Sequence, residues 1–236
     1  KVLLTLISLL LIIKPILAEN QPIEINRYAQ TVSDKEILNK VEYISNDLTK
    51  GRLTGTFGNM ITASYLRHFF TKYGLSKFYS QSYTQSFKVD STTIGRNIIG
   101  VIPSKYYSDE YILISAHYDH LGIIGGSIYN GADDNASGVA AVLTMIELFS
   151  KMRLEREGPA KNILIALYDA KENSMAGSKY FFDNLPIDPS KIKYSINIDQ
   201  IGCTFSPPGN NSEYILYLAS KNIRYEIRRR IDMLNN

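Results

Sequence analysis

The stretch that most constrains this chain runs from Tyr111 to Gly138 and joins an apolar run to two groups of polar residues. Residues 111–114 read YILI, a pattern typical of a strand that is buried on both faces of a sheet. The tetrapeptide HYDH (117–120) follows this run, and the acidic pair Asp133-Asp134 stands just before a helical pattern. Open α/β sheets bind ligands at the carboxyl ends of such strands. The stretch therefore predicts half of a metal site.

Two other apolar runs end in polar residues in the same way. Residues 162–168 read NILIALY and lead to Glu172, and the strand pattern at 194–198 leads to Asp199. If these strands are parallel to the one at 111–116, their carboxyl ends meet at one edge of the sheet. We therefore expect the polar residues after all three strands to lie together.

The residue types gathered in this way favour a transition metal. They are one imidazole and three carboxylates, from His117, Asp134, Glu172 and Asp199. Such a set suits Zn²⁺ better than Ca²⁺, which seldom takes imidazole. Two metal ions that share one carboxylate are an arrangement used for peptide and ester hydrolysis.

Helical patterns alternate with the strand patterns along the chain. Predicted helices cover 36–48, 60–73 and 175–184, and another begins after Asn135; predicted strands cover 78–89, 97–102, 111–116, 162–168, 194–198 and 214–218. Gly74 is the expected stop of the second helix, 51–59 a glycine-rich loop and 151–161 a charged loop. This alternation predicts an α/β fold with a mixed, largely parallel central sheet flanked by helices. At 236 residues and 44% hydrophobic, the chain is most simply one domain.

The N-terminus has the layout of a secretory signal peptide. Residues 2–13 are almost wholly apolar, between Lys1 and Lys14, which is short for a membrane span, and Ala18 is a suitable cleavage point. We expect a signal peptide at 1–18, a linker at 19–35 and the catalytic domain at 36–236. The mature chain would then be secreted or periplasmic, with no stable membrane association after cleavage. An uncleaved N-terminal anchor is the alternative.

Charge and cysteine content exclude several functions. Without Lys1 and Lys14, 24 basic residues face 23 acidic ones, which gives no electrostatic argument for a nucleic-acid partner. The basic run at 228–230 reads as the solvated face of a helix. Cys203 is the single cysteine, so neither an intramolecular disulfide nor a cysteine-based zinc site is available.

Several motifs resemble those of metallopeptidase family twenty-eight, the co-catalytic zinc aminopeptidases of the aminopeptidase Y type. In chain order they are AHYDHLG (116–122), NGADDNASGVA (130–140), the EN-x-x-x-GS stretch (172–178) and NIDQIG (197–202). The segment GRLTGTFGN (51–59) also resembles the one that precedes the catalytic core in this family. The match extends over about residues 36–202, and it implies a zinc exopeptidase-like fold that acts on peptide substrates.

The resemblance also implies a role for each site residue. His117 and Asp199 would bind one zinc, Glu172 the second, and Asp134 would bridge both. Asp119 would orient the imidazole of His117, as an outer partner of a metal-bound histidine does. Asp133 and His120 match the motifs, but they are not ligands in that scheme. His68, far in sequence from these residues, reads as a surface or core-edge histidine.

Two departures from the family pattern stand out. The family's general base directly precedes the zinc-binding glutamate, and that position here is Lys171. A protonated lysine has no lone pair for the proton of a water molecule, so Asp169 is a possible substitute. The family's last zinc ligand is a histidine well beyond the position of Asp199, whereas the last histidine here is His120. From these features we expect a C-terminally incomplete chain that binds one or two zinc ions.

Three functions remain open from the sequence. The first is a secreted zinc exopeptidase that releases N-terminal residues by means of a metal-activated water. The second is an inactive family member that keeps the fold and partial metal binding, which Lys171 favours. The third is glutaminyl-peptide cyclisation on the same fold with one zinc, against which the intact HYD and DD motifs count.

Overall fold

The computed structural model describes residues 27–79 and 81–203. The chain divides into two compact units between Val32 and Ser33. In the first unit the described part contains one short 3₁₀ turn, η1 (Ala29–Thr31); the second unit holds the other described elements. The predicted signal peptide and the strand predicted at 214–218 lie outside the described residues. Within those residues, no helix has the length and apolar character that crossing a membrane requires.

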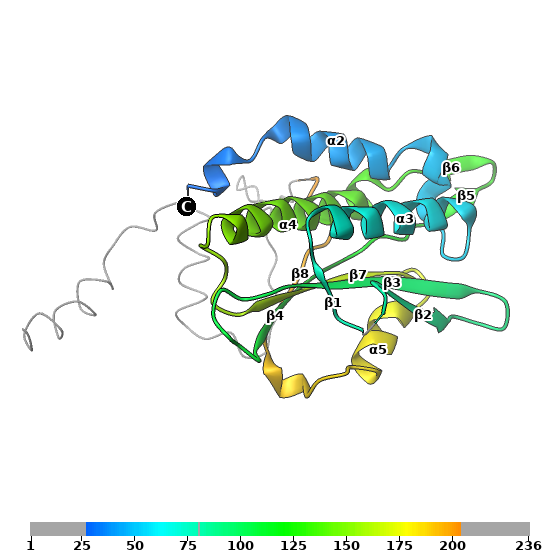
Figure 1. Cartoon of the computed structure of the whole chain (residues 1–236). Coiled ribbons are helices and arrows are strands. Elements are labelled where there is room, and N and C mark those ends of the chain that lie inside the picture. The colour runs from blue at the N-terminus through cyan, green and yellow to red at the C-terminus, as the bar shows by residue number, and fades with distance from the viewer. Residues whose placement is uncertain (1–26, 80, 204–236) are drawn as a thin grey trace, which may run out of the picture. The chain divides into compact units, whose positions relative to one another are not determined.

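A mixed sheet forms the centre of the second unit (Figure 1). Its described strands are β1 (Ser76–Lys77), β2 (Thr84–Lys88), β3 (Ile94–Ile102), β4 (Tyr111–His117), β7 (Asn162–Tyr168) and β8 (Ile192–Asn197). The order is β1-β3-β7-β4-β8, and β2 also pairs with β3. Strand β4 runs parallel to β7 and β8, whereas β1, β2 and β7 are antiparallel to β3. The predicted mixed α/β fold is confirmed, but the prediction of a largely parallel sheet is wrong: among the described strands, only β4 pairs in parallel, with β7 and β8, and every pairing of β3 is antiparallel.

Helices cover both faces of this sheet. Figure 1 shows α2 (Asp34–Ile44), α3 (Phe57–Lys72) and α4 (Gly138–Leu154) on one face and α5 (Ala176–Asp183) on the other. Strand β7 is buried along its whole length, and its residues alternate between the two faces as the period of a strand requires. Ile163, Ile165 and Leu167 join the core beneath α2, α3 and α4, and Leu164, Ala166 and Tyr168 join the core with Phe181 of α5.

The register of the parallel strands sets the place of the site. His117 at the end of β4 is paired with Tyr168 at the end of β7, and Ser115 is paired with Asn197 at the end of β8. The three carboxyl ends therefore lie at the same edge of the sheet. This confirms the expected grouping of the segments that follow these strands.

Element boundaries differ from the predicted ones where capping groups act. Helix α3 begins at Phe57, inside the predicted loop, because the Thr56 hydroxyl accepts a hydrogen bond from the Asn59 amide (3.4 Å). Helix α4 continues to Leu154, so the predicted charged loop starts later, and Lys151 and Arg153 fall in the last helical turn, where basic side chains are favourable.

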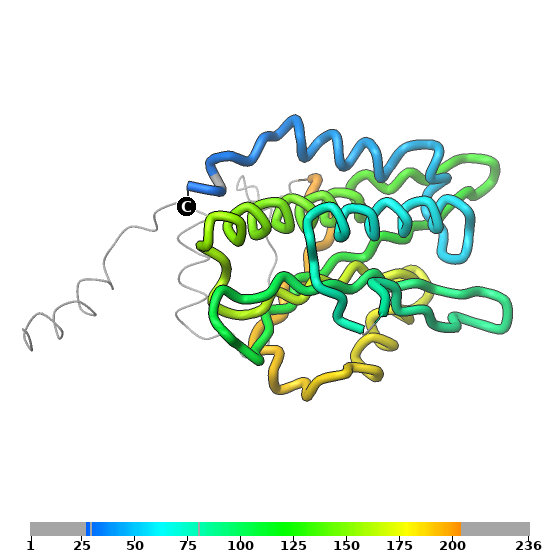
Figure 2. The backbone as a smooth tube through the Cα atoms, viewed as in Figure 1, coloured from blue at the N-terminus to red at the C-terminus, as the bar shows by residue number. Residues whose placement is uncertain are grey.

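The segment before α3 forms a tight turn instead of an open loop. It is the 3₁₀ element η2 (Asp47–Arg52), and Figure 2 shows it beside the hairpin of β5 (Gly122–Ile124) and β6 (Ser127–Tyr129). Gly51 has φ +66°, and a Cβ there would lie 2.4 Å from the Tyr129 carbonyl oxygen. Only glycine fits this close approach. Gly74, at φ +65°, follows α3 as predicted, and the Leu75 amide beyond it donates to the Phe70 carbonyl (3.0 Å).

Candidate metal centre

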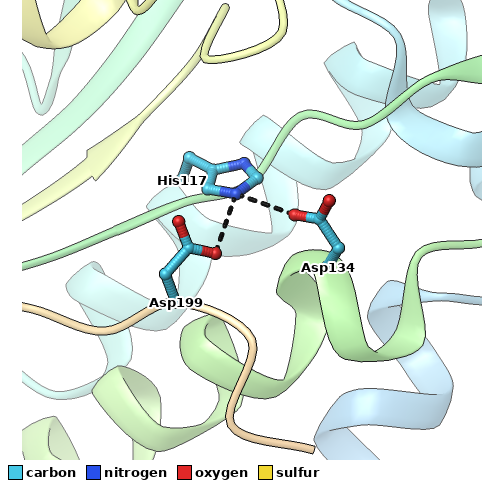
Figure 3. Close-up of side chains that lie close together, drawn as sticks. All are labelled: His117, Asp134 and Asp199. Carbon is cyan, nitrogen blue, oxygen red and sulfur yellow. Dashed lines mark ion pairs between the residues drawn. The ribbon is translucent and has the colours of Figure 1, made fainter. Parts of the chain in front are cut away.

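Three residues from three segments converge at the carboxyl edge of the sheet (Figure 3). The Nε2 atom of His117 lies 3.1 Å from Asp134 Oδ1 and 3.3 Å from Asp199 Oδ1. His117 ends β4, Asp134 precedes α4 and Asp199 follows β8. Their donor atoms lie within 4.8 Å of one another, close enough to hold a single metal ion. We call these three residues the first cluster.

The imidazole of His117 fits a metal ligand. The residue is buried, and its Nε2 atom has no hydrogen-bond partner although two carboxylate oxygens lie nearby. A buried polar atom without a partner is costly, and a metal ion between these three groups removes that cost. Burial acts to lower the pKa of His117, but the carboxylates of Asp119 and Asp199 outweigh it and raise the pKa to about 9. The site thus favours a cation at this nitrogen, and one nitrogen with two oxygens suits Zn²⁺.

Asp119 connects the end of β4 to the turn after β7. Its buried carboxylate accepts hydrogen bonds from the amides of Lys171 and Glu172, both at 3.0 Å. On the other side, His117 Nδ1 lies 3.2 Å from the Asp119 carbonyl oxygen and 3.5 Å from Oδ1. Asp119 therefore has the geometry of a residue that orients the imidazole and fixes the neighbouring turn.

We expect Asp119→Asn to weaken zinc binding by about 10- to 100-fold, the usual effect of losing an outer partner of a metal-bound histidine. The amide nitrogen of asparagine cannot accept one of the two backbone hydrogen bonds that Asp119 accepts. Competition with a chromophoric chelator measures the affinity, and the exposed Asp183 on α5 provides the control variant Asp183→Asn. Equal zinc affinities for the two variants would argue against the positioning role.

Asn135 holds the segments on either side of the first cluster. Its fully buried amide nitrogen donates to the carbonyls of Ile198 (2.9 Å) and His117 (3.4 Å). Its Oδ1 accepts from the amides of Gly138 (3.0 Å), at the start of α4, and Gln200 (3.1 Å). Asp199 lies between two residues that this single side chain binds. The sequence places Asn135 only just before a predicted helix; its contacts to β4 and to the segment after β8 were missed.

A second cluster shares Asp134 with the first. It consists of His120, Asp134 and Glu172, whose donor atoms also lie within 4.8 Å of one another. The Nδ1 atom of His120 is buried, has no hydrogen-bond partner and lies 3.8 Å from Asp134 Oδ2. Burial lowers the pKa of His120, which favours the neutral imidazole that a metal needs. The family resemblance implied no ligand role for His120, and the structure places it in this cluster.

Lys171 reaches into the second cluster. Its Nζ atom lies 3.0 Å from Glu172 Oε1 and 3.5 Å from Asp134 Oδ1. Burial acts to lower the pKa of Lys171, but Glu172 and Asp134 outweigh it and raise the pKa. The side chain is therefore an ammonium ion at neutral pH, and it has no lone pair with which to accept a proton.

The substitute base that the sequence suggested, Asp169, is wrongly placed for that task. It is fully buried, and Oδ1 accepts hydrogen bonds from Thr54 Oγ1 (2.9 Å), Asn59 Nδ2 (2.9 Å) and the Ala170 amide (2.8 Å). Its Oδ2 accepts from the Arg96 amide (2.9 Å). With both oxygens occupied, Asp169 holds α3, β3 and the end of β7 together.

Asp133 also makes a structural contact, because its Oδ1 accepts a hydrogen bond from the Gly202 amide (2.7 Å).

Arg52 fixes the loops that carry His120 and Asp134. It is fully buried and donates four hydrogen bonds, to the carbonyls of Tyr118 (2.8 Å), Ile44 (2.9 Å), Asn130 (2.6 Å) and Gly131 (2.9 Å). Burial lowers its pKa to about 10, against the raising effect of Asp119 and Asp134. Its partners are 8 to 79 residues away in the sequence, so no local pattern reveals this role.

His68 is exposed on α3, which agrees with the expectation of a surface or core-edge histidine.

The solved structures that this chain resembles include zinc exopeptidases and glutaminyl cyclases. A Zn-dependent exopeptidase from Parabacteroides distasonis has a TM-score of 0.57 and 21% identity, over 72% of this chain and 62% of that one. A glutaminyl cyclase from Porphyromonas gingivalis has a TM-score of 0.58 and 22% identity, over 72% and 60%. At such identities the likeness shows the fold alone. The fold is thus one that zinc exopeptidases and glutaminyl cyclases share.

Sequence comparison gives the family. The model of peptidase family M28 matches residues 97–228, and this chain belongs to that family. Leucine aminopeptidase 1 of Ajellomyces capsulatus (strain H88) is 25% identical over 195 residues, which cover 74% of this chain and 50% of the relative. Leupeptin-inactivating enzyme 1 of Streptomyces exfoliatus is 38% identical over 88 residues, or 37% and 18% of the two chains. The chain thus spans half or less of the length of these curated relatives.

Proposed function

We propose that this chain is a zinc-dependent exopeptidase of the aminopeptidase type, which hydrolyses the N-terminal bond of peptide substrates. The observation that carries the proposal is the first cluster, where the unpartnered Nε2 of His117 faces Asp134 and Asp199. These three residues would hold the metal, which would supply Lewis-acid chemistry when bound. Asp119 orients His117. Membership of peptidase family M28 supports the same chemistry.

A cavity of about 250 Å³ beside the first cluster supports a small substrate. His117, Lys171 and Asp199 line it, and so do the apolar side chains of Met175 and Phe182. A site for the end of a peptide needs polar groups at the reacting bond and an apolar wall for a side chain. We propose that the first side chain of the substrate lies against Met175 and Phe182, while its carbonyl lies beside His117 and Asp199.

Lys171 favours a second proposal, in which this chain binds metal but has no peptidase activity. Where the resemblance implies a carboxylate base, this chain has an ammonium ion held by Glu172 and Asp134. A general base contributes about 10²- to 10⁴-fold to the rate. We therefore expect slow turnover from the proposed enzyme.

We also propose that this chain acts outside the cytoplasm, secreted or periplasmic, because the sequence of residues 1–18 has the layout of a signal peptide.

Hydrolysis of a panel of aminoacyl reporter amides, with an N-terminal glutaminyl peptide included, tests the function. We expect release of the reporter that stops with a chelator, returns with zinc and is lost in His117→Ala. The exposed His68 provides the control, since His68→Ala should keep the wild-type rate. A zinc-loaded chain that hydrolyses none of the amides would contradict the proposal and favour the non-catalytic alternative. Conversion of the glutaminyl peptide to its cyclic form, without hydrolysis of the amides, would identify a cyclase.

A further inference from the structure

We propose that the ammonium group of Lys171 takes the place of a second metal ion, so that this chain binds one zinc, at the first cluster. The inference rests on the proposed function, because it assumes a metal at His117, Asp134 and Asp199. The second cluster has the residue types for another ion, namely His120, Asp134 and Glu172. Its two carboxylates, however, already have a cation of the protein between them.

The position of the Lys171 ammonium group carries the argument. Its Nζ lies 3.0 Å from Glu172 Oε1 and 3.5 Å from Asp134 Oδ1, so it contacts both carboxylates of the second cluster. Asp134 Oδ1 also faces His117, whereas His120 Nδ1 lies 3.8 Å from the other oxygen, Oδ2. A divalent ion bound by both carboxylates would lie within a few ångströms of this nitrogen. Like charges at such a distance repel strongly in a partly buried site, so the ion and the ammonium group compete for one place.

The backbone keeps the Lys171 side chain at this place. The amides of Lys171 and Glu172 both donate to the buried carboxylate of Asp119, each at 3.0 Å. This fixes the turn after β7, from which the side chain extends, and about 30% of that side chain is exposed. Two carboxylates on one side and an anchored backbone on the other therefore hold the ammonium group against Glu172 and Asp134.

His120, the third member of the second cluster, lies beside the carboxylate of Asp134. His120 is buried, and its Nδ1 has no hydrogen-bond partner. Its ring packs so closely on Gly131 that a Cβ at that position would lie 2.5 Å from a ring carbon. The ring is thus held in place, and it does not depend on Lys171 for its orientation. Removal of the lysine charge would leave a preformed set of one nitrogen and two carboxylates.

Zinc stoichiometry at buffered free zinc tests the inference on the full chain. We expect one bound zinc for the wild type and for Lys171→Arg, which keeps the charge, and two for Lys171→Met and Lys171→Gln. The second ion should bind the neutral variants about 10- to 1000-fold more tightly than the wild type, the range over which one nearby charge changes the proton affinity of a group. His120→Ala added to Lys171→Met should remove the second ion again. The exposed Lys179 on α5 provides the control variant Lys179→Met, with one zinc expected.

Each outcome has a separate meaning. Two tight zinc ions on the wild type would overturn the role of Lys171 and leave the proposed function standing. The role would also be overturned if both neutral variants, shown by circular dichroism to be folded, still bound one ion. A wild type that binds no zinc would instead overturn the proposed function, and this inference with it.

Discussion

Replacing Arg52 by methionine is expected to destabilise the chain by at least about 3 kcal/mol, because the change leaves several buried carbonyl groups without a donor at roughly 1–3 kcal/mol each. Arg52 donates to carbonyls in three segments, at Ile44, Tyr118 and the pair 130–131. Methionine keeps an unbranched apolar stem but ends short of the guanidinium, so the change removes the hydrogen bonds and also leaves a small cavity beside the carbonyls. Lysine keeps the charge but cannot reach four acceptors, and Arg52→Lys should lose an intermediate amount.

Urea unfolding of Arg52→Met, followed by circular dichroism, measures this effect. Arg67 on α3 is exposed, and Arg67→Met should change the free energy of unfolding by no more than about 0.5 kcal/mol. The loops that Arg52 holds include those of His120 and Asp134, so zinc affinity should fall together with stability. Equal unfolding midpoints for Arg52→Met and Arg67→Met would contradict the role assigned to Arg52.

Replacing His117 by alanine is expected to weaken the tight zinc site by more than about 100-fold, the upper end of the effect seen when only an outer partner is lost. His117 supplies the only nitrogen of the first cluster, and the oxygens of Asp134 and Asp199 suit zinc poorly without it. The variant also removes the buried nitrogen that has no hydrogen-bond partner. Although burial acts to lower it, the carboxylates of Asp119 and Asp199 raise the pKa of His117 to about 9, so the metal-free variant should also lose stability below that pH. Zinc affinities are therefore compared on chains that circular dichroism shows to be folded.

The other two histidines are matched controls for this variant. His68 is exposed on α3, and His120 belongs only to the second cluster. Titration against a competing chelator should give wild-type affinity for His68→Ala and nearly wild-type affinity for His120→Ala. A loss in His120→Ala as large as that in His117→Ala would show that the tight site is the second cluster and not the first.

Local sequence patterns were enough to predict the strands that became β4, β7 and β8, whereas the strand predicted at 78–89 forms only over Thr84–Lys88, and the hairpin of β5 and β6 was missed. The apolar runs that became β4 and β7 are stable only when neighbouring strands and helices bury them. The polar residues that follow these runs therefore lie at the carboxyl edge of the sheet. His117, Asp134 and Asp199 lie together there. The metal they would bind remains a prediction.

The roles that sequence analysis missed depend on contacts between distant segments. Arg52 lies in a glycine-rich segment with no periodicity, and three of its four partners are 66 to 79 residues away. From the sequence, Asp169 was a possible substitute for the general base. The structure shows that Thr54, Asn59 and the Arg96 amide donate hydrogen bonds to its oxygens. His120 was set aside because the family pattern assigns it no metal; its place beside Asp134 follows from the turn at Gly131.

Anomalous diffraction at the zinc edge, from crystals of the zinc-loaded chain, tests the central claim most directly. The account predicts one strong peak within bonding distance of His117 Nε2, Asp134 and Asp199, at about 2.0–2.2 Å from each ligand atom. It also predicts the Lys171 ammonium group, and no second peak, between Asp134 and Glu172. A map without a peak beside His117, or with its main peak between His120 and Glu172, would contradict it.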